Sequence, residues 1–213
     1  MVVSGSGNVA IYAAQKAMEL GAKVVAMSDS NGFIVDENGV DLAVVKQIKE
    51  VERGRIREYA QRVPGAIYTE GSHGIWRMRC DIALPCATQN ELNGDDADML
   101  LKNKPLCVAE VSNMGCTAEA AEKFVAAKML FAPGKAVNAG GVATSGLEMT
   151  QNAIRLTWSE AEVDEKLHHI MNSIHEQCVK YGKQADGYVD YVKGANIAGF
   201  MKVANAMMAQ GIV

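Results

Sequence analysis

The sequence lacks any apolar run of the ~18 residues needed to cross a bilayer. It also lacks the charged first segment of a signal peptide, because a glycine turn follows Met1 within four residues. These two absences predict a cytoplasmic protein without a membrane partner.

Cysteine pairs of the CxxC type are absent as well. The five cysteines are scattered along the chain, at Cys80, Cys86, Cys107, Cys116 and Cys178. An odd, scattered set argues against a disulfide framework and favours reduced thiols. No histidine partner is apparent for Cys86, so we interpret it as a small buried residue rather than a nucleophile.

Metal-ligand spacing is not evident either. His168, His169 and His175 occur on one predicted helix, but a metal would also need a carboxylate or cysteine at ligand spacing. We therefore interpret these histidines as part of a structural helix and predict no metal.

The chain has no excess of positive charge: 21 Lys and Arg face 25 Asp and Glu, for a net charge of −4. Non-specific nucleic-acid binding needs clustered cations, so nucleic acid is excluded as a partner. Apolar residues make up 49% of the 213 residues, which is enough for one real core. With no repeat and no flexible linker, we expect residues 1–213 to form one domain, helical from about residue 145 to 213.

Short apolar runs bounded by Gly, Pro, Asn or Asp alternate with stretches of helical period, which is typical of βαβ units. The sequence thus predicts an α/β fold, Rossmann-like and doubly wound, with a mostly parallel sheet and additional carboxy-terminal helices. Strands are expected at residues 2–4, 23–27, 33–35, 81–84, 106–110 and 129–131. Helices are expected at residues 9–20, 42–62, 117–127, 145–158, 160–181 and 197–208.

A glycine-rich turn follows the first strand. Gly5-Ser6-Gly7-Asn8-Val9-Ala10 fits the pattern G-x-G-x-x-G/A and leads into a predicted helix. Gly5 permits the tight turn, and Gly7 lets the backbone approach a pyrophosphate. Because the helix N-terminus offers free N–H groups, the turn predicts a dinucleotide-binding site.

An acidic residue, Asp29, ends the following strand. At this position a carboxylate ordinarily accepts hydrogen bonds from the adenosine ribose, which favours NAD. The adjacent Ser28 and Ser30 are donors for a phosphate, which leaves NADP open. Lys46 and Lys49 follow on the next helix and are interpreted as a solvated helix face.

Three more loops are predicted at the same sheet edge, where the carboxyl ends of parallel strands meet. They span residues 85–90, 112–115 and 138–145. Their small residues, amides and glycines suit the lining of a dinucleotide site.

Taken together, these segments resemble the hexameric glutamate dehydrogenases of bacteria and fungi over essentially the whole chain. The resemblance is carried by motifs in the family's order, among them SGSGNVA, SDSNG, DIALPCATQNEL, NAGGVATSGLEM and GANIAGF. It implies interconversion of L-glutamate with 2-oxoglutarate and ammonia, in nitrogen assimilation. It also implies that the full-length enzyme is a homo-oligomer.

The resemblance also implies site residues. Ser6, Asn8 and Val9 match positions that contact the cofactor, together with Gly5 and Gly7 of the turn. Ala87, Thr88, Asn113 and Asn138 match positions along its nicotinamide half, and Val142 and Ser145 match positions that touch glutamate. Ser28-Asp29-Ser30 looks like the NADP-dependent branch, so NADP is the expected cofactor and NAD the alternative.

The catalytic lysine and aspartate of the family belong to an amino-terminal domain, and no GGxKGG-like segment occurs here. We therefore expect no catalytic residue in these 213 residues and negligible turnover by them alone. Two alternatives stay open: a leucine- or phenylalanine-type dehydrogenase, and a stand-alone dinucleotide-binding or regulatory protein.

One segment departs from the family. AEVSNMGCT stands where the family usually has AEGANMPT, so Val111, Ser112, Gly115 and Cys116 are unusual. The β-branched Val111 is expected to narrow the nicotinamide site or shift Asn113.

Overall fold

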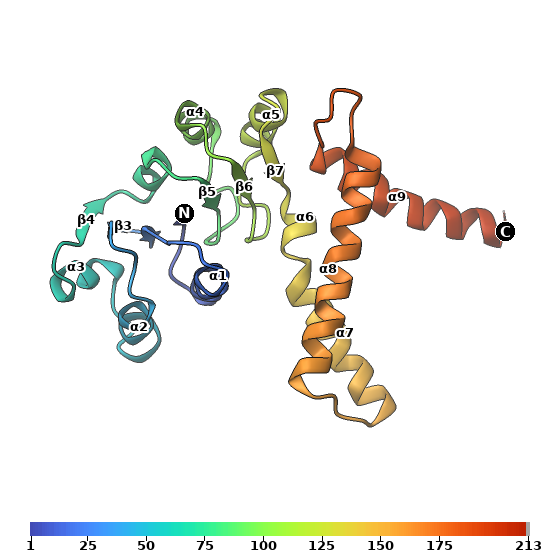
Figure 1. Cartoon of the computed structure of the whole chain (residues 1–213), viewed down its shortest axis with the longest axis horizontal. Helices are drawn as coiled ribbons and strands as arrows, with labels where there is room; N and C mark the ends of the chain where they lie inside the picture. Colours follow the sequence, from blue (N-terminus) through green and yellow to red (C-terminus); the bar gives the residue numbers. More distant parts are fainter. Residues whose placement is uncertain (212–213) are drawn as a thin grey trace. The chain divides into compact units, whose positions relative to one another are not determined.

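The computed structural model describes residues 1–211, which divide into two compact units, residues 1–129 and residues 130–211. The first unit contains a sheet with helices on both faces (Figure 1). On one side lie α1 (Asn8–Glu19), α2 (Leu42–Lys46) and α3 (Tyr59–Arg62), and on the other lie α4 (Gly94–Asn103) and α5 (Ala118–Ala126). This is the doubly wound α/β fold that the alternation of apolar runs and helical stretches predicts.

Six strands of the first unit pair in the order β4-β3-β2-β1-β5-β6. They are β1 (Val2–Val3), β2 (Ala26–Ser28), β3 (Gly32–Val35), β4 (Ile67–Glu70), β5 (Ile82–Leu84) and β6 (Cys107–Ala109). The β1/β2, β1/β5 and β5/β6 pairs are parallel, while β3 pairs antiparallel with both β2 and β4. The sheet is therefore mixed at one edge, and β1 lies in its middle.

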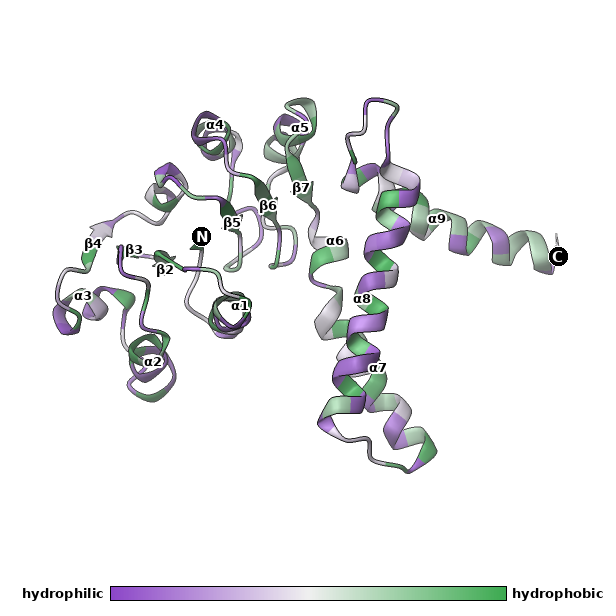
Figure 2. Ribbon diagram, viewed as in Figure 1, coloured by the Kyte–Doolittle hydropathy of each residue, from purple (hydrophilic) through white to green (hydrophobic). Residues whose placement is uncertain are grey.

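The ribbon of strands such as β5 and β6 is coloured as hydrophobic in Figure 2, and apolar residues of this sheet and its helices form one core. Its fully buried members include Val3 on β1, Met27 on β2, Ile34 on β3 and Ile11 on α1 (Asn8–Glu19). Because β1 has buried neighbours on both sides, two apolar residues are enough to fix its place in the sheet.

Two helices of the other face have clear caps. In α4 (Gly94–Asn103), the Asn93 side chain accepts hydrogen bonds from the first turn and Asp96 binds back to the Asn93 amide, forming a capping box. In α5 (Ala118–Ala126), the Thr117 hydroxyl caps the Ala120 amide at 3.2 Å. The sequence prediction found α5 but missed α4 and the edge strand β4.

The long helix predicted at residues 42–62 is wrong. The structure has α2 (Leu42–Lys46), a π-helical turn η1 (Gln47–Val51), a 3-10 turn η2 (Ile56–Glu58) and α3 (Tyr59–Arg62). Arg53 has a φ of 55°, and the Gly54 amide donates back to the Ile48 carbonyl at 2.8 Å, so the helix ends there. A second 3-10 turn, η3 (Ser72–Arg77), precedes β5.

The second unit contains β7 (Leu130–Ala132), α6 (Gly134–Val137), α7 (Ala139–Ile154), α8 (Glu160–Gly182) and α9 (Tyr191–Gln210). The loop predicted at residues 138–145 is instead helical from Ala139 onward, so α7 begins six residues before the predicted start at Ser145. A Cβ at Gly194 of α9 would overlap the carbonyl of Cys178 on α8, so this glycine lets the two helices pack closely. Among the described residues, no helix is long and apolar enough to span a membrane.

A buried tyrosine ties α3 to the β3 side of the sheet. The Tyr59 hydroxyl donates to Asp36 Oδ2 at 2.9 Å and accepts from the Asp41 amide at 2.7 Å. Burial raises the pKa of Tyr59 to about 12. We expect Tyr59→Phe to lower the free energy of unfolding by about 1–3 kcal/mol, because it leaves both partners unsatisfied. Urea unfolding measures this loss.

The matched control is Tyr12→Phe. Because Tyr12 is 58% exposed, the loss of its hydroxyl should change the free energy of unfolding little. The pKa gives a second readout. From pH 10 to about 12 the unfolded chain loses the Tyr59 proton first, so the wild type loses stability there and Tyr59→Phe loses less. Equal stability and equal pH dependence of both variants would contradict this role.

Candidate functional site

A groove of about 780 Å³ lies where β1, β2 and β5 end. It is lined by residues 4–9, 28–30 and 86–91, and by Lys49, Ser72, His73 and Trp76. All of these belong to the first unit. In open α/β sheets, ligands bind beyond the carboxyl ends of the strands where the strand order reverses, and β1 is that point here.

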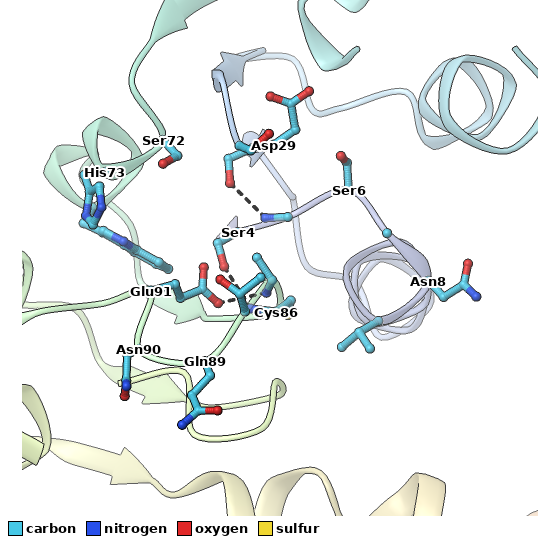
Figure 3. A pocket seen from close by; sticks show the side chains of 18 of the residues that line it. Ser4, Ser6, Asn8, Asp29, Ser72, His73, Cys86, Gln89, Asn90 and Glu91 are labelled. Atoms are coloured by element: carbon cyan, nitrogen blue, oxygen red, sulfur yellow. Dashed lines mark hydrogen bonds between the residues drawn. The ribbon is translucent and has the colours of Figure 1, made fainter. Parts of the chain in front are cut away.

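The glycine turn forms the floor of this groove. Gly5 has a φ of +83°, and a Cβ there would lie 3.1 Å from the Cα of Ala87. Its amide donates to the buried Ser28 hydroxyl at 2.8 Å (Figure 3). The turn therefore touches the last residue of β2 and the loop after β5.

The second glycine of the turn is different. Gly7 is the N-cap of α1 and has nothing within 4 Å of the position of a Cβ. No side chain caps the helix, so the first amides of α1 are free to bind an anion. Ser6 is buried and lines the groove, whereas the Asn8 side chain points away from Ser4 and Cys86 (Figure 3).

The Asp29 carboxylate is bound to the protein's own backbone. Oδ1 accepts hydrogen bonds from the Asn31 and Gly32 amides, at 2.9 and 3.3 Å, and Oδ2 accepts from the Ile56 amide at 3.0 Å. Figure 3 shows the carboxylate directed away from Ser4 and Ser6. Asp29 thus holds the β2–β3 turn against η2.

Two cationic side chains, Arg55 and Lys49, lie near the segment Ser28–Ser30, which forms one wall of the groove. Arg55 Nη1 donates to the Ser30 hydroxyl at 3.1 Å, and Lys49 lines the groove while donating to the Gly54 carbonyl at 2.9 Å. Lys46 instead donates to Gln15 at 2.7 Å and lies over the Tyr12 ring. Ser30 therefore lies in a positively charged corner, which suits a phosphate.

The loop after β5 forms the opposite wall and contains Ala87 and Thr88. The Cys86 amide donates to Ser4 Oγ at 2.8 Å, and the Ala87 amide donates to Glu91 Oε1 at 2.8 Å. Burial raises the pKa of the Cys86 thiol above its usual range, so it stays protonated and is a poor nucleophile.

The loop after β6, which begins at Glu110, packs against the loop after β5. The Val111 and Ser112 amides both donate to the Pro85 carbonyl at 2.9 Å. The Val111 side chain packs against the core cluster, so its bulk is directed inward. Asn113 follows in the turn and is not among the residues that line the groove.

The remaining predicted residues belong to the second unit. Asn138 is the N-cap of α7, and Val142 and Ser145 lie in its first two turns. Val142 is 77% exposed. Their roles toward the nicotinamide and glutamate stay predictions.

Sequence reasoning missed several residues that line the groove, among them His73, Trp76 and Glu91, and it assigned Lys49 to a solvated face. It also missed Arg55, which does not line the groove but binds Ser30 at its edge. Arg55 follows a break in the predicted helix, and Gly54 was the available signal for that break. His73 Nδ1 lies 2.7 Å from Asp96 Oδ2, which connects η3 to α4, an element that was not predicted.

Among residues 1–211, no group of three or more His, Cys, Asp and Glu side chains is placed to hold a metal ion.

Comparison with known proteins gives concordant matches. The family model of the glutamate/leucine/phenylalanine/valine dehydrogenases matches residues 1–211. The chain is 59% identical to the NAD-specific glutamate dehydrogenase of Bacteroides fragilis, covering 100% of this chain and 48% of that protein. It is 56% identical to the NADP-specific glutamate dehydrogenase of Escherichia coli strain K12, covering 99% and 47%.

Solved structures agree. The Plasmodium falciparum glutamate dehydrogenase superposes with a TM-score of 0.92 at 43% identity, over 100% of this chain and 46% of that chain. The chain thus spans about half the length of the relatives it matches.

The two glycines of the turn generate a stability prediction. Gly5→Ala places a side chain in the left-handed region and against Ala87, so we expect it to lower the free energy of unfolding by about 1–3 kcal/mol. Gly7→Ala enters open space at a φ of −87°, so it should lower stability by less than about 1 kcal/mol, the scale of alanine at a helix N-cap. Chemical denaturation of the two variants measures the difference. Equal losses in both would contradict the distinction between them.

Proposed function

Since the chain belongs to the glutamate, leucine, phenylalanine and valine dehydrogenase family, we propose that it is the dinucleotide-binding half of a glutamate dehydrogenase. The reaction proposed for the whole protein is reductive amination of 2-oxoglutarate with ammonia, and its reverse, in the cytoplasm. The observation that carries the proposal is the glycine turn, which presents the uncapped amides of α1 to the groove.

The residues of the groove fit a dinucleotide. The space beside Gly7 is open, and a Cβ would fill it where a pyrophosphate must approach the backbone. The amides of α1 and the helix dipole would stabilise the phosphate charge. When bound, the cofactor supplies the hydride. The chain's own contribution is to bind and orient it.

The other proposed cofactor contacts come from the residues on the two sides of the groove. Gly5, Ser6, Asn8 and Val9 would hold the phosphates, with Ala87 and Thr88 along the opposite side. Ser28 would act indirectly, because its hydroxyl supports the Gly5 amide. Asn113 and Asn138 are proposed toward the nicotinamide, and Val142 and Ser145 toward glutamate.

We propose NADP as the preferred cofactor. The names of the relatives do not decide this, because an NAD-specific and an NADP-specific enzyme are similarly identical to this chain. The geometry favours NADP for two reasons. The Asp29 carboxylate is occupied by three backbone amides. Arg55 binds the Ser30 hydroxyl, and Lys49 lines the same groove.

Apolar surface in the second unit supports an oligomeric whole protein. No residue of α7 is buried within the described chain, and Met149 on it is 71% exposed. Much of the α9 ribbon is coloured as hydrophobic in Figure 2. Phe200 and Met207 on this helix are 68% and 66% exposed. We propose that further protein covers these faces. Sedimentation of the whole protein at the mass of one chain would argue against this.

The first test is titration of the purified 213-residue chain with NADPH and NADH, followed by cofactor fluorescence. We expect saturable binding of both and tighter binding of NADPH. Gly7→Ala should stay folded at 25 °C but lose affinity at least about tenfold, because its Cβ occupies the pyrophosphate position. No binding of either cofactor by the wild type would refute the proposal.

Cofactor preference has its own test. Arg55→Gln should weaken NADPH binding about tenfold, the scale of one hydrogen bond to a charged group, and leave NADH nearly unchanged. Arg57→Gln is the matched control, since Arg57 is two residues away and exposed. An equal effect on NADPH and NADH would place Arg55 elsewhere than at the 2′-phosphate.

A further inference from the structure

Glu91 stands at the end of the loop after β5, and its carboxyl meets three loops of the groove. Oε1 accepts from the Ala87 amide at 2.8 Å, and the Ser112 hydroxyl donates to it over 3.5 Å. The Ser4 hydroxyl also binds it, while Ser4 Oγ accepts from the Cys86 amide. Figure 3 shows the carboxyl beside Ser4 and Cys86. One side chain thus connects the ends of β1, β5 and β6.

The surroundings of this carboxyl are unfavourable to a charge. Burial raises the pKa of Glu91, and the groups that oppose this effect are hydroxyls and the backbone amides of Ala87 and Thr88. The ionised form is therefore stabilised by the same bonds that fix the loop. When the carboxyl takes up a proton, it loses acceptor capacity toward Ala87 and Thr88, two residues that line the groove.

The loop after β6 is adapted to this contact. A Cβ at Gly115 would lie 2.5 Å from Ser112 Oγ and 2.9 Å from Pro85 Cβ. The absence of a side chain at Gly115 therefore leaves the space in which the Ser112 hydroxyl reaches Glu91. Both residues depart from the usual family pattern at this point.

We propose that Glu91 is a positioning residue for the dinucleotide: its ionised carboxyl connects the three loops and holds Ala87 and Thr88 in the arrangement that binds the cofactor. This rests on the proposed function. A carboxylate without this role would only repel the phosphates. The two interpretations predict opposite changes in dinucleotide affinity. Removal of the charge weakens binding if Glu91 positions the loop, and strengthens binding if Glu91 only repels the phosphates.

The groups whose charge is coupled to that of Glu91 are the thiols of Cys86 and Cys116, whose pKa values burial raises. Glu110 is bound to the Cys116 amide at 2.7 Å, and His73 lines the same groove as Glu91. The thiols stay protonated over the range of the experiment and contribute no titration there.

The experiment measures the affinity of the 213-residue chain for NAD⁺ by calorimetry between pH 5 and 9. We chose NAD⁺ because it lacks the 2′-phosphate, which itself titrates near pH 6. The wild type should bind more weakly as the pH falls through the raised pKa of Glu91. Glu91→Gln should bind about tenfold more weakly than the wild type at pH 8, the scale of one hydrogen bond to a charged group, and should lack this pH dependence.

Two variants complete the design. Glu122→Gln removes one exposed charge on α5 and should keep the wild-type profile. Ser112→Ala removes a donor that lowers the pKa of Glu91, so its affinity should begin to fall at a higher pH than in the wild type. This variant tests the proposal even where Glu91→Gln folds poorly.

Three outcomes would overturn the inference: tighter binding by Glu91→Gln, an unchanged pH profile in Glu91→Gln, or an unmoved midpoint in Ser112→Ala. Each is distinct from a failure of the proposed function, in which the wild type itself binds no dinucleotide.

Discussion

The close approach of Gly5 to the backbone of Ala87 is the constraint on which the groove depends. β1 is only two residues long, and its turn begins directly beside the loops after β2 and β5. Because Gly5 has no side chain, its Cα reaches Ala87 while its amide reaches the Ser28 hydroxyl. These contacts fix the direction in which α1 begins. The free amides of α1 then face the groove without any contribution from a charged side chain.

Three polar side chains of the groove follow the same logic, since each accepts a hydrogen bond from a backbone amide. Ser4 binds the Cys86 amide, Asp29 binds the amides of the β2–β3 turn and η2, and Glu91 binds the Ala87 amide. Among residues 1–211, no buried side-chain nitrogen or oxygen is left without a hydrogen-bond partner. The groove is therefore held in shape by its own polar residues before a ligand enters it.

The sequence predicts the parts of this arrangement that are local. The glycine turn, the flanking strands and α1 all depend on neighbouring residues, and the predicted class of fold is confirmed. The direction of the Asp29 carboxylate is not local, because it depends on the Ile56 amide, 27 residues further along the chain. Ile56 is available only because the predicted helix at residues 42–62 breaks at Arg53 and Gly54. The same break brings Arg55 to Ser30, so one error about a helix concealed the cationic side of the site.

A similar dependence explains the unusual segment after β6. Taken singly, Val111, Ser112 and Gly115 look like separate departures from the family pattern. In the structure Val111 packs into the core, which directs its β-branched side chain away from the groove. The Ser112 hydroxyl turns toward Glu91, and the missing side chain of Gly115 leaves room for it. A Cβ at residue 115 would collide with that hydroxyl, so Ser112 and Gly115 are sterically one change rather than two. This coupling makes the segment compatible with an intact groove in the first unit, while the expected effect of Val111 on the nicotinamide site stays a prediction.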